Sequence, residues 1–250
     1  CAGQEGGAEA AIHTMLEIFE LDDTDAVLLV DAQNAFNTLN RRAALHNIRI
    51  ICPSFATILI NWYRTPARLF VAGGMELASQ EGTTQGCPLA MQMYALGVVP
   101  LIDRLRPFLS DSGEGEAGMQ YDGKEGGDAE EGDNEVEGEG DEEGGEGRQM
   151  SRRGAVQTWY ADDSQAAGRL RMLRAWWDAI ARIGPGYGYH CNPIKTYLVV
   201  KAHLMAEASE LFEGTGVTVV DGACRDLGAF IGDLPRAHRF VAEKVDKWVE

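Results

Sequence analysis

Three aspartates stand in contexts where they could bind a divalent cation. Two of them, Asp162 and Asp163, are adjacent. The largely apolar run 155–159 before them and the small residues 166–168 after them predict a strand, a tight turn and a returning strand, with both acids at the tip. Neighbouring carboxylates repel each other, and a hard divalent cation relieves this cost because it prefers carboxylate oxygen. A solvated turn often carries the same pair, so the pair alone is a weak signal.

The third aspartate, Asp31, directly follows Ala26–Val30, a continuous apolar run of strand length. Such a run is typical of a strand buried on both faces, and an acid at its exit lies at the edge of the sheet. If this strand and the hairpin are neighbours, Asp31 meets Asp162. Three carboxylates at one edge of the sheet would then form a site for hard divalent cations.

Five short motifs follow one another along the chain. They are Asp31-x-x-x-Ala35-Phe36, Gln85-Gly86-x-Pro88-Leu89, Tyr160-Ala161-Asp162-Asp163, Asn192-x-x-Lys195-Thr196 and Leu227-Gly228-x-x-Ile231-Gly232. Each motif is weak alone, but together and in this order they resemble the reverse transcriptases of retroelements, most closely those of non-LTR retrotransposons. The resemblance covers Ala26 to Gly232, apart from one acidic insert.

The resemblance implies an enzyme, an RNA-directed DNA polymerase of the nucleotidyltransferase class. It implies that Asp31, Asp162 and Asp163 are catalytic, and that these three and the carbonyl oxygen of Ala32 bind two Mg²⁺ ions, with Mn²⁺ as an alternative. The implied substrates are deoxynucleoside triphosphates, and the implied nucleic-acid partners are an RNA template and a DNA primer. No membrane partner is expected, because the sequence has no long apolar stretch.

The residues implied to contact the substrate are Ala32, Phe36, Gln85, Gly86 and Lys195. Phe36 would lie under the sugar and exclude a 2′-hydroxyl, although an ordinary core phenylalanine is the alternative. Gly86 would let the backbone approach the nucleotide closely, and Gln85 offers both a donor and an acceptor. Lys195 would balance the charge of the triphosphate or protonate the leaving pyrophosphate, and a surface lysine is the alternative.

Strands and helices are mixed without a regular strand–helix–strand alternation, so we expect an α+β fold. The resemblance implies a polymerase palm, which is a small antiparallel sheet with helices packed on one face, together with partial fingers and a missing thumb. The expected helices are Glu9–Glu20, Arg41–Ile51, a helix with Ser54 as N-cap, 88–105, Leu170–Ile183 and Arg236–Glu250. The expected strands, besides those above, are a hairpin at Arg68–Ala78, Tyr197–Val200, Val217–Val220 and one strand after a turn at Asp221-Gly222.

The expected organisation divides the chain into seven segments. These are a partial fingers helix (1–24), the first palm strand (25–40), a fingers segment (41–84), a palm helix (85–110), the acidic insert (111–147), the catalytic hairpin and following palm elements (148–235), and the start of a thumb or connection (236–250). Because the chain opens on Cys1 rather than methionine, we interpret it as a fragment, or as a gene model that lacks its beginning.

The formal net charge of −17 is concentrated in the insert, where 16 acidic residues and one lysine lie between positions 111 and 147. This segment is rich in glycine and poor in apolar residues, which predicts disorder because little surface can be buried. The five cysteines are scattered and odd in number, so they indicate a reducing interior, in the cytoplasm or nucleus, rather than a disulfide framework.

Two other functions compete with the polymerase hypothesis. An inactive reverse-transcriptase-like remnant that binds RNA or protein would fit a truncated chain with an acidic insert, although all three aspartates are intact. An RNA-directed RNA polymerase is disfavoured by Tyr160–Asp163 and by Phe36.

Overall fold

The structure is a computed structural model of the 250-residue chain. It describes residues 5–84, 86–110, 154–226, 229–232 and 234–249. The acidic insert, and therefore its predicted disorder, lies outside the described residues, as do Gln85, Leu227 and Gly228. Among the helices that are described, none is long and apolar enough to cross a membrane.

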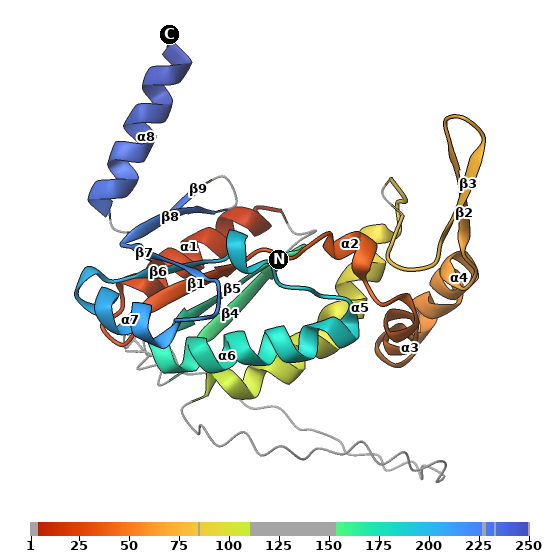
Figure 1. Ribbon diagram of the computed structural model, residues 1–250, viewed down its shortest axis with the longest axis horizontal. Helices are drawn as coiled ribbons and strands as arrows, with labels where there is room; N and C mark the ends of the chain where they lie inside the picture. The colour runs from red at the N-terminus through yellow and green to blue at the C-terminus, as the bar shows by residue number, and fades with distance from the viewer. Residues whose placement is uncertain (1–4, 85, 111–153, 227–228, 233, 250) are drawn as a thin grey trace, which may run out of the picture.

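A five-stranded sheet forms the centre of the molecule (Figure 1). Its order is β4 (Val156–Tyr160), β5 (Asp163–Gly168), β1 (Ala26–Val30), β6 (Tyr197–Val200) and β7 (Thr218–Asp221). The middle strand, β1, is buried along its whole length, as its unbroken apolar sequence predicts. All pairings are antiparallel except β6–β7, which is parallel. The expected purely antiparallel sheet is therefore wrong, and the architecture is mixed α/β with a mixed sheet, compatible with the α+β class.

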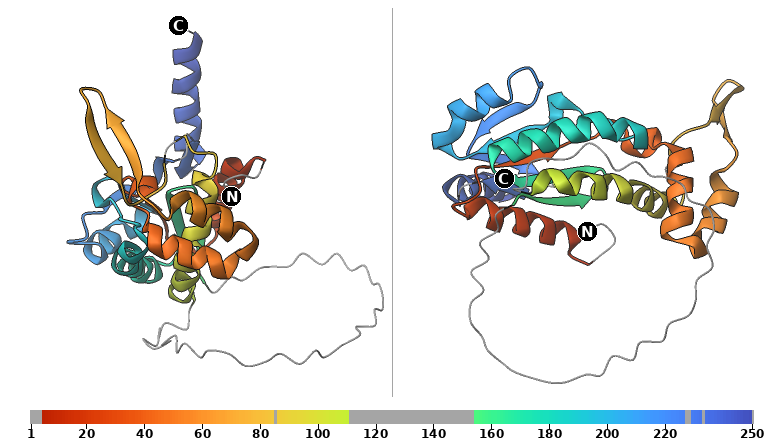
Figure 2. Two further views of the ribbon diagram at one scale, coloured as in Figure 1. Left: turned by 90° about the vertical axis from the view of Figure 1, so that its right-hand side faces the viewer. Right: turned by 90° about the horizontal axis from the view of Figure 1, so that it is seen from below.

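Helices cover both faces of this sheet (Figure 2). Successive residues of β1 point to opposite faces, so Val27 and Leu29 pack with helix α1 (Gly7–Glu20). Ala26, Leu28 and Val30 belong to the larger core on the other face. That core includes α5 (Ala90–Leu105) and α6 (Leu170–Ile183). The expectation of helices on one face is also wrong, because the apolar face of α1 finds its partner on the opposite side.

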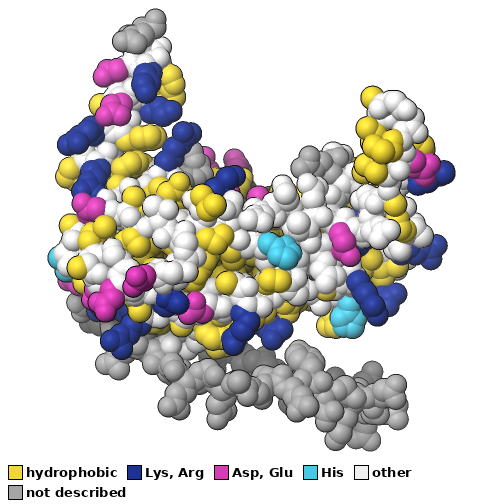
Figure 3. All heavy atoms as spheres, in the orientation of Figure 1, with side chains coloured by type: hydrophobic (Ala, Val, Ile, Leu, Met, Phe, Trp, Pro, Cys, Tyr) yellow, Lys and Arg dark blue, Asp and Glu magenta, His cyan; other side chains and the backbone are white. Residues whose placement is uncertain are grey.

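A second group of elements lies at one end of the sheet. It comprises α3 (Arg41–Ile51), α4 (Pro53–Tyr63) and the two-stranded hairpin β2 (Ala67–Val71) and β3 (Met75–Ser79). The hairpin projects from the body and carries exposed apolar side chains (Figure 3). Phe70 and Met75 are among the exposed residues of this hairpin. The predicted N-cap at Ser54 is wrong, because Pro53 already occupies the first turn and Cys52 is the cap.

The C-terminal part adds the short helix α7 (Met205–Leu211), the hairpin of β8 (Ala223–Asp226) and β9 (Ala229–Gly232), and helix α8 (Leu234–Val249). The sequence predicted one strand after Gly222 where the structure has two. Helix α8 extends away from the body, so that it and the β2–β3 hairpin stand on either side of the sheet's upper edge in Figure 1.

Candidate functional site

The sheet pairing brings two distant aspartates to the same edge. β1 runs antiparallel to β5, with Val30 opposite Ser164. Asp31 therefore leaves β1 beside the place where β5 begins. The last pair of the β4–β5 hairpin joins Tyr160 to Asp163, which leaves Asp162 in the connecting turn. Asp31 and Asp162 consequently reach one end of the sheet from neighbouring strands.

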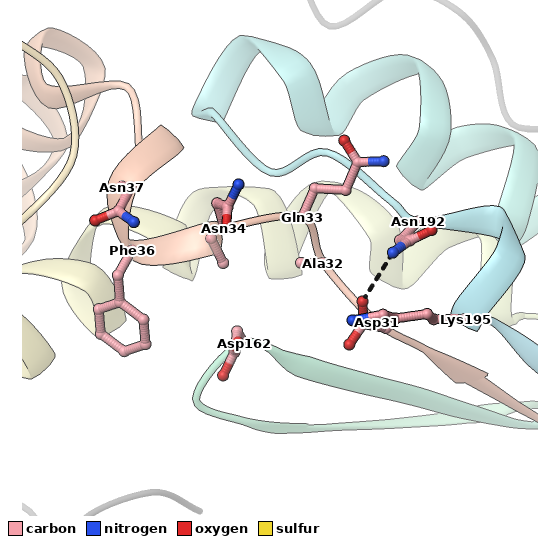
Figure 4. A pocket seen from close by; sticks show the side chains of 10 residues that line it. Asp31, Ala32, Gln33, Asn34, Phe36, Asn37, Asp162, Asn192 and Lys195 are labelled. Carbon is pink, nitrogen blue, oxygen red and sulfur yellow. Dashed lines mark hydrogen bonds between the residues drawn. The ribbon is translucent and has the colours of Figure 1, made fainter.

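These two aspartates line a pocket of about 500 Å³ (Figure 4). The lining consists of Asp31, Ala32, Gln33, Asn34, Ala35, Phe36, Asn37, Asp162, Asn192 and Lys195. Five of these residues were predicted from the sequence to act in catalysis or substrate binding, and they are Asp31, Ala32, Phe36, Asp162 and Lys195. The pocket therefore gathers the first motif, one acid of the third motif, and Asn192 and Lys195 of the fourth.

Three other predicted site residues are not part of this lining. Asp163 is the first residue of β5, is half-buried and is not among the residues that line the pocket. Gly86 is exposed and has a φ of 86°, as expected for a glycine in a turn. Gln85 lies outside the described residues. Of the three predicted catalytic carboxylates, the pocket thus brings two together.

The strand exit that carries Asp31 is held by the segment before β6. Ala32 and Cys191 form an isolated antiparallel bridge. The bridge hydrogen bonds are made by the neighbours, because Gln33 N–H donates to the His190 carbonyl at 2.8 Å and Asn192 N–H donates to the Asp31 carbonyl at 2.8 Å. The carbonyl of Ala32 takes no part in these two bonds, and Ala32 is one of the residues that line the pocket.

Asn192 also orients the Asp31 carboxylate. Its side-chain amide donates to Asp31 Oδ2 at 3.3 Å (Figure 4). This contact leaves the second carboxylate oxygen open to the pocket for another ligand. Lys195 ends the short helix η3 (Pro193–Lys195) three residues later and is exposed, which puts a cation on the same wall.

The turn that carries Asp162 is anchored from below by a buried tyrosine. The Tyr189 hydroxyl donates to the Asp162 backbone carbonyl at 3.1 Å and lies 2.8 Å from Ser164 Oγ. A phenol has one proton, so the Ser164 hydroxyl donates to Tyr189 in this arrangement. Ala161 has a φ of 54°, a conformation that costs a non-glycine residue about 1–2 kcal/mol. The turn is therefore held in a strained shape by its surroundings.

Phe36 is positioned by the single-turn helix α2 (Ala35–Thr38), which begins after Asn34 at a φ of 48°. The Phe36 carbonyl accepts from Thr83 N–H at 2.6 Å. The preceding residue on that loop, Gly82, packs so closely that an added Cβ would collide with the Asn37 carbonyl, and its φ is 70°. The loop that precedes Gln85 is thus fastened directly onto the segment that carries Phe36.

The donor set fits a hard divalent cation. Mg²⁺ is usually bound by one or two protein carboxylates, with water and substrate phosphate completing the shell. Asp31 and Asp162, with the nearby carbonyl of Ala32, supply ligands of this kind. Within the described ranges no cluster of three or more His, Cys, Asp or Glu side chains is close enough to hold a metal without such help.

Two buried tyrosines flank the acidic turn as neutral groups. Burial raises the pKa of Tyr94, and the carboxylates of Asp162 and Asp163 raise it further. Burial, chiefly, also raises the pKa of Tyr189. Both hydroxyls therefore remain protonated around neutral pH, and Tyr189 keeps the proton that it donates to the Asp162 carbonyl.

Sequence reasoning assigned no role to Tyr94, Tyr189 or Asn192. Asn192 stands inside a recognised motif, and its position beside Lys195 was a usable signal. The three amides of Gln33, Asn34 and Asn37 directly after Asp31 were another. Tyr94 and Tyr189 gave no such signal, because a tyrosine in an apolar helix or in a glycine-rich bend is ordinary.

A search against protein-family models found no match for this chain, and a search of curated proteins found no significantly similar sequence.

Proposed function

We propose that this chain is the palm, with partial fingers, of a retroelement reverse transcriptase of the non-LTR kind. In this proposal it extends a DNA primer on an RNA template with deoxynucleoside triphosphates, inside the cell, in the cytoplasm or nucleus. The observation that carries the proposal is the convergence of Asp31 and Asp162 on one pocket whose lining also contains Phe36 and Lys195. The five ordered motifs of the sequence independently favour the same activity.

Asp31, Asp162 and the carbonyl of Ala32 are the groups that would hold Mg²⁺, with Asp163 as a further candidate from the motif. When bound, Mg²⁺ would supply activation of the primer hydroxyl and neutralisation of phosphate charge. The chain's own contribution is to orient these ligands. Asn192 fixes one oxygen of Asp31, and Tyr189 fixes the backbone of Asp162.

The remaining lining residues suit a nucleotide. Lys195 brings a positive charge that favours the triphosphate and the developing charge of the leaving pyrophosphate. The Phe36 ring supplies an apolar surface beside a sugar and has no group to pair with a 2′-hydroxyl. A ribonucleotide would be rejected there by a clash that only the wrong substrate makes. The Gln33, Asn34 and Asn37 amides offer donors and acceptors to the sugar and phosphates.

Primer extension by the full chain tests the proposal. The purified protein would be incubated with an RNA template, a labelled DNA primer, the four deoxynucleoside triphosphates and Mg²⁺. We expect extension by the wild type, and a loss of about 100-fold or more for Asp31→Asn and Asp162→Asn, because each variant removes a charge at the reacting centre. Asp103→Asn is the matched control, because Asp103 is an exposed acid on α5 that is not part of the pocket lining and forms an ion pair with Arg106.

The outcome also separates the polymerase from the inactive-remnant hypothesis. A chain that binds the primer–template but never extends it, under any divalent cation tested, would favour the remnant. Equal primer extension by the wild type and by Asp162→Asn would refute the assignment of Asp162 as a catalytic residue.

A further inference from the structure

Tyr94 covers one face of the Phe36 ring. The two rings are stacked, with centroids 4.5 Å apart and planes inclined by 27°. Phe36 lines the pocket and Tyr94 does not, so Phe36 stands between Tyr94 and the pocket space. Tyr94 is only 2% exposed and is one of the largest buried side chains of the described core. The ring of Phe36 therefore cannot withdraw from the pocket in the direction of α5.

Tyr94 is itself held rigidly. The neighbouring Met93 is fully buried. One turn later on α5, Gly97 packs so close to α3 that a Cβ added there would lie 2.9 Å from Ala44 Cβ. A contact this tight fixes the distance between the two helices, because packed interiors have little free space. The support beneath Phe36 is thus a fixed surface rather than a mobile side chain.

The ring of Tyr94, rather than its hydroxyl, makes this contact. The hydroxyl oxygen is buried and has no hydrogen-bond partner. An unpaired buried hydroxyl costs about 1–3 kcal/mol, so replacing tyrosine by phenylalanine at such a position is expected to leave stability unchanged or to raise it. The backbone of Phe36 is independently fixed by the bond from Thr83 to its carbonyl. Phe36 is therefore restrained at its main chain by Thr83 and at its ring by Tyr94.

We propose that Tyr94 is a positioning residue for sugar selection, because it holds the Phe36 ring at the place where a 2′-hydroxyl would clash. This inference rests on the proposed function and deepens it, since it names a second residue that decides between deoxyribonucleotides and ribonucleotides. The Phe36 ring excludes a 2′-hydroxyl sterically only if the ring cannot move aside. Removing the support gives Phe36 a space to move into, and the ribonucleotide is then admitted without any change in the pocket lining.

The test compares Tyr94→Leu, Tyr94→Met and Tyr94→Phe with the wild type in the full chain. For each, kcat/KM would be measured for a deoxynucleotide and for the matching ribonucleotide on the same primer–template. We expect Tyr94→Leu and Tyr94→Met to lower the preference for the deoxynucleotide by about tenfold or more, the lower end of what one small group decides in an apolar pocket. Tyr94→Phe should keep the wild-type preference. Phe36→Ala should lose at least as much preference as Tyr94→Leu.

A second measurement does not depend on turnover. In this assay the complex with a dideoxy-terminated primer is titrated with the deoxynucleotide and with the ribonucleotide, and the concentration of each that stabilises the complex is measured. The ratio of the two concentrations should rank the variants in the same order as the kcat/KM preference. Urea unfolding should show that each variant is folded. If Tyr94→Leu and Tyr94→Met keep the wild-type ratio in both assays, Tyr94 does not position Phe36. If Tyr94→Phe loses the ratio as well, the hydroxyl is used and the inference is wrong. A wild-type chain that neither extends a primer nor binds either nucleotide overturns the proposed function, and this inference with it.

Discussion

The hydroxyl of Tyr189 supports the turn that carries Asp162, and Tyr189→Phe removes only this group. The ring would keep its edge-on contact with Trp159 at 5.3 Å. Two hydrogen bonds would be lost, one to the Asp162 carbonyl at 3.1 Å and one with Ser164 Oγ at 2.8 Å. These two losses differ in cost, because their surroundings differ.

The Asp162 carbonyl lies at the half-buried turn beside the pocket, where water can replace the lost donor, so this loss costs about 0.5–1 kcal/mol. Ser164 is fully buried, at 0% exposure, and its hydroxyl would be left without an acceptor. An orphaned buried donor costs about 1–3 kcal/mol. We therefore expect Tyr189→Phe to lower the free energy of unfolding by about 1.5–4 kcal/mol.

Urea unfolding followed by tryptophan fluorescence would measure this, since Trp159 and Trp176 lie in the same region. Tyr94→Phe is the matched control, because it removes a buried hydroxyl that has no partner. Its unfolding free energy should not fall, and should rise by as much as about 1–3 kcal/mol, because the variant removes an unsatisfied buried group. The double variant Tyr189→Phe with Ser164→Ala removes the orphan together with its partner, so it should be less destabilised than the sum of the single variants by about 1 kcal/mol or more. Additive effects, or a Tyr189→Phe variant that is no less stable than the control variant, would refute the role given to the hydrogen bonds of Tyr189 with Ser164 and with the Asp162 carbonyl.

Three further outcomes follow from other parts of the molecule. Arg41→Met should lower the free energy of unfolding by about 2–4 kcal/mol, because the buried guanidinium donates to three backbone carbonyls of the loop 79–82 that would lose their donor. Urea unfolding measures this loss, and a change below about 1 kcal/mol would contradict the stabilising role of these hydrogen bonds. Replacing residues 111–153 by a five-residue glycine–serine linker should leave the melting temperature unchanged or slightly raised. The flanking residues Ser110 and Gly154 already form a β-bridge, and a shorter loop costs less entropy to close. A melting temperature lower by about 5 °C or more would show that the segment contributes to the core. Burial raises the pKa of the Cys191 thiol from 9.0 to about 12, so its stabilising contribution is complete below pH 9 and is lost as the pH rises toward 12. Wild type should therefore lose about 1–2 kcal/mol more stability than Cys191→Ala between pH 8.5 and about pH 10.5, and equal losses in urea unfolding at the two pH values would contradict this.

Much of the secondary structure could be predicted from the sequence. The strand Ala26–Val30 and the helices Arg41–Ile51 and Leu170–Ile183 have the predicted bounds. Their signals are local, since an unbroken apolar run, an apolar face of helical period and a following proline or glycine lie within the element itself. The position of Asp31 at a strand exit and of Asp162 at a hairpin tip were predictable for the same reason.

The arrangement of these elements was decided only by the tertiary structure. Nothing local distinguishes a parallel partner for β6 from an antiparallel one, or assigns α1 to the opposite face from α5 and α6. The sheet is mixed and covered on both faces because each amphipathic helix must find an apolar surface, and β1 offers one on either side.

The same holds within the candidate site. The sequence named Asp162 and Asp163 together, but Asp162 lies in the turn and lines the pocket, whereas Asp163 is the first residue of β5 and is not part of the lining. Tyr94 and Tyr189 have no local sequence signature, because their roles come from contacts with distant residues. Tyr94 stacks on the Phe36 ring, and Tyr189 donates a hydrogen bond to the Asp162 carbonyl. Sequence by itself determined which residues have the chemistry; the packing of distant segments determined which of them meet, since contact across a core depends on partners that no local pattern encodes.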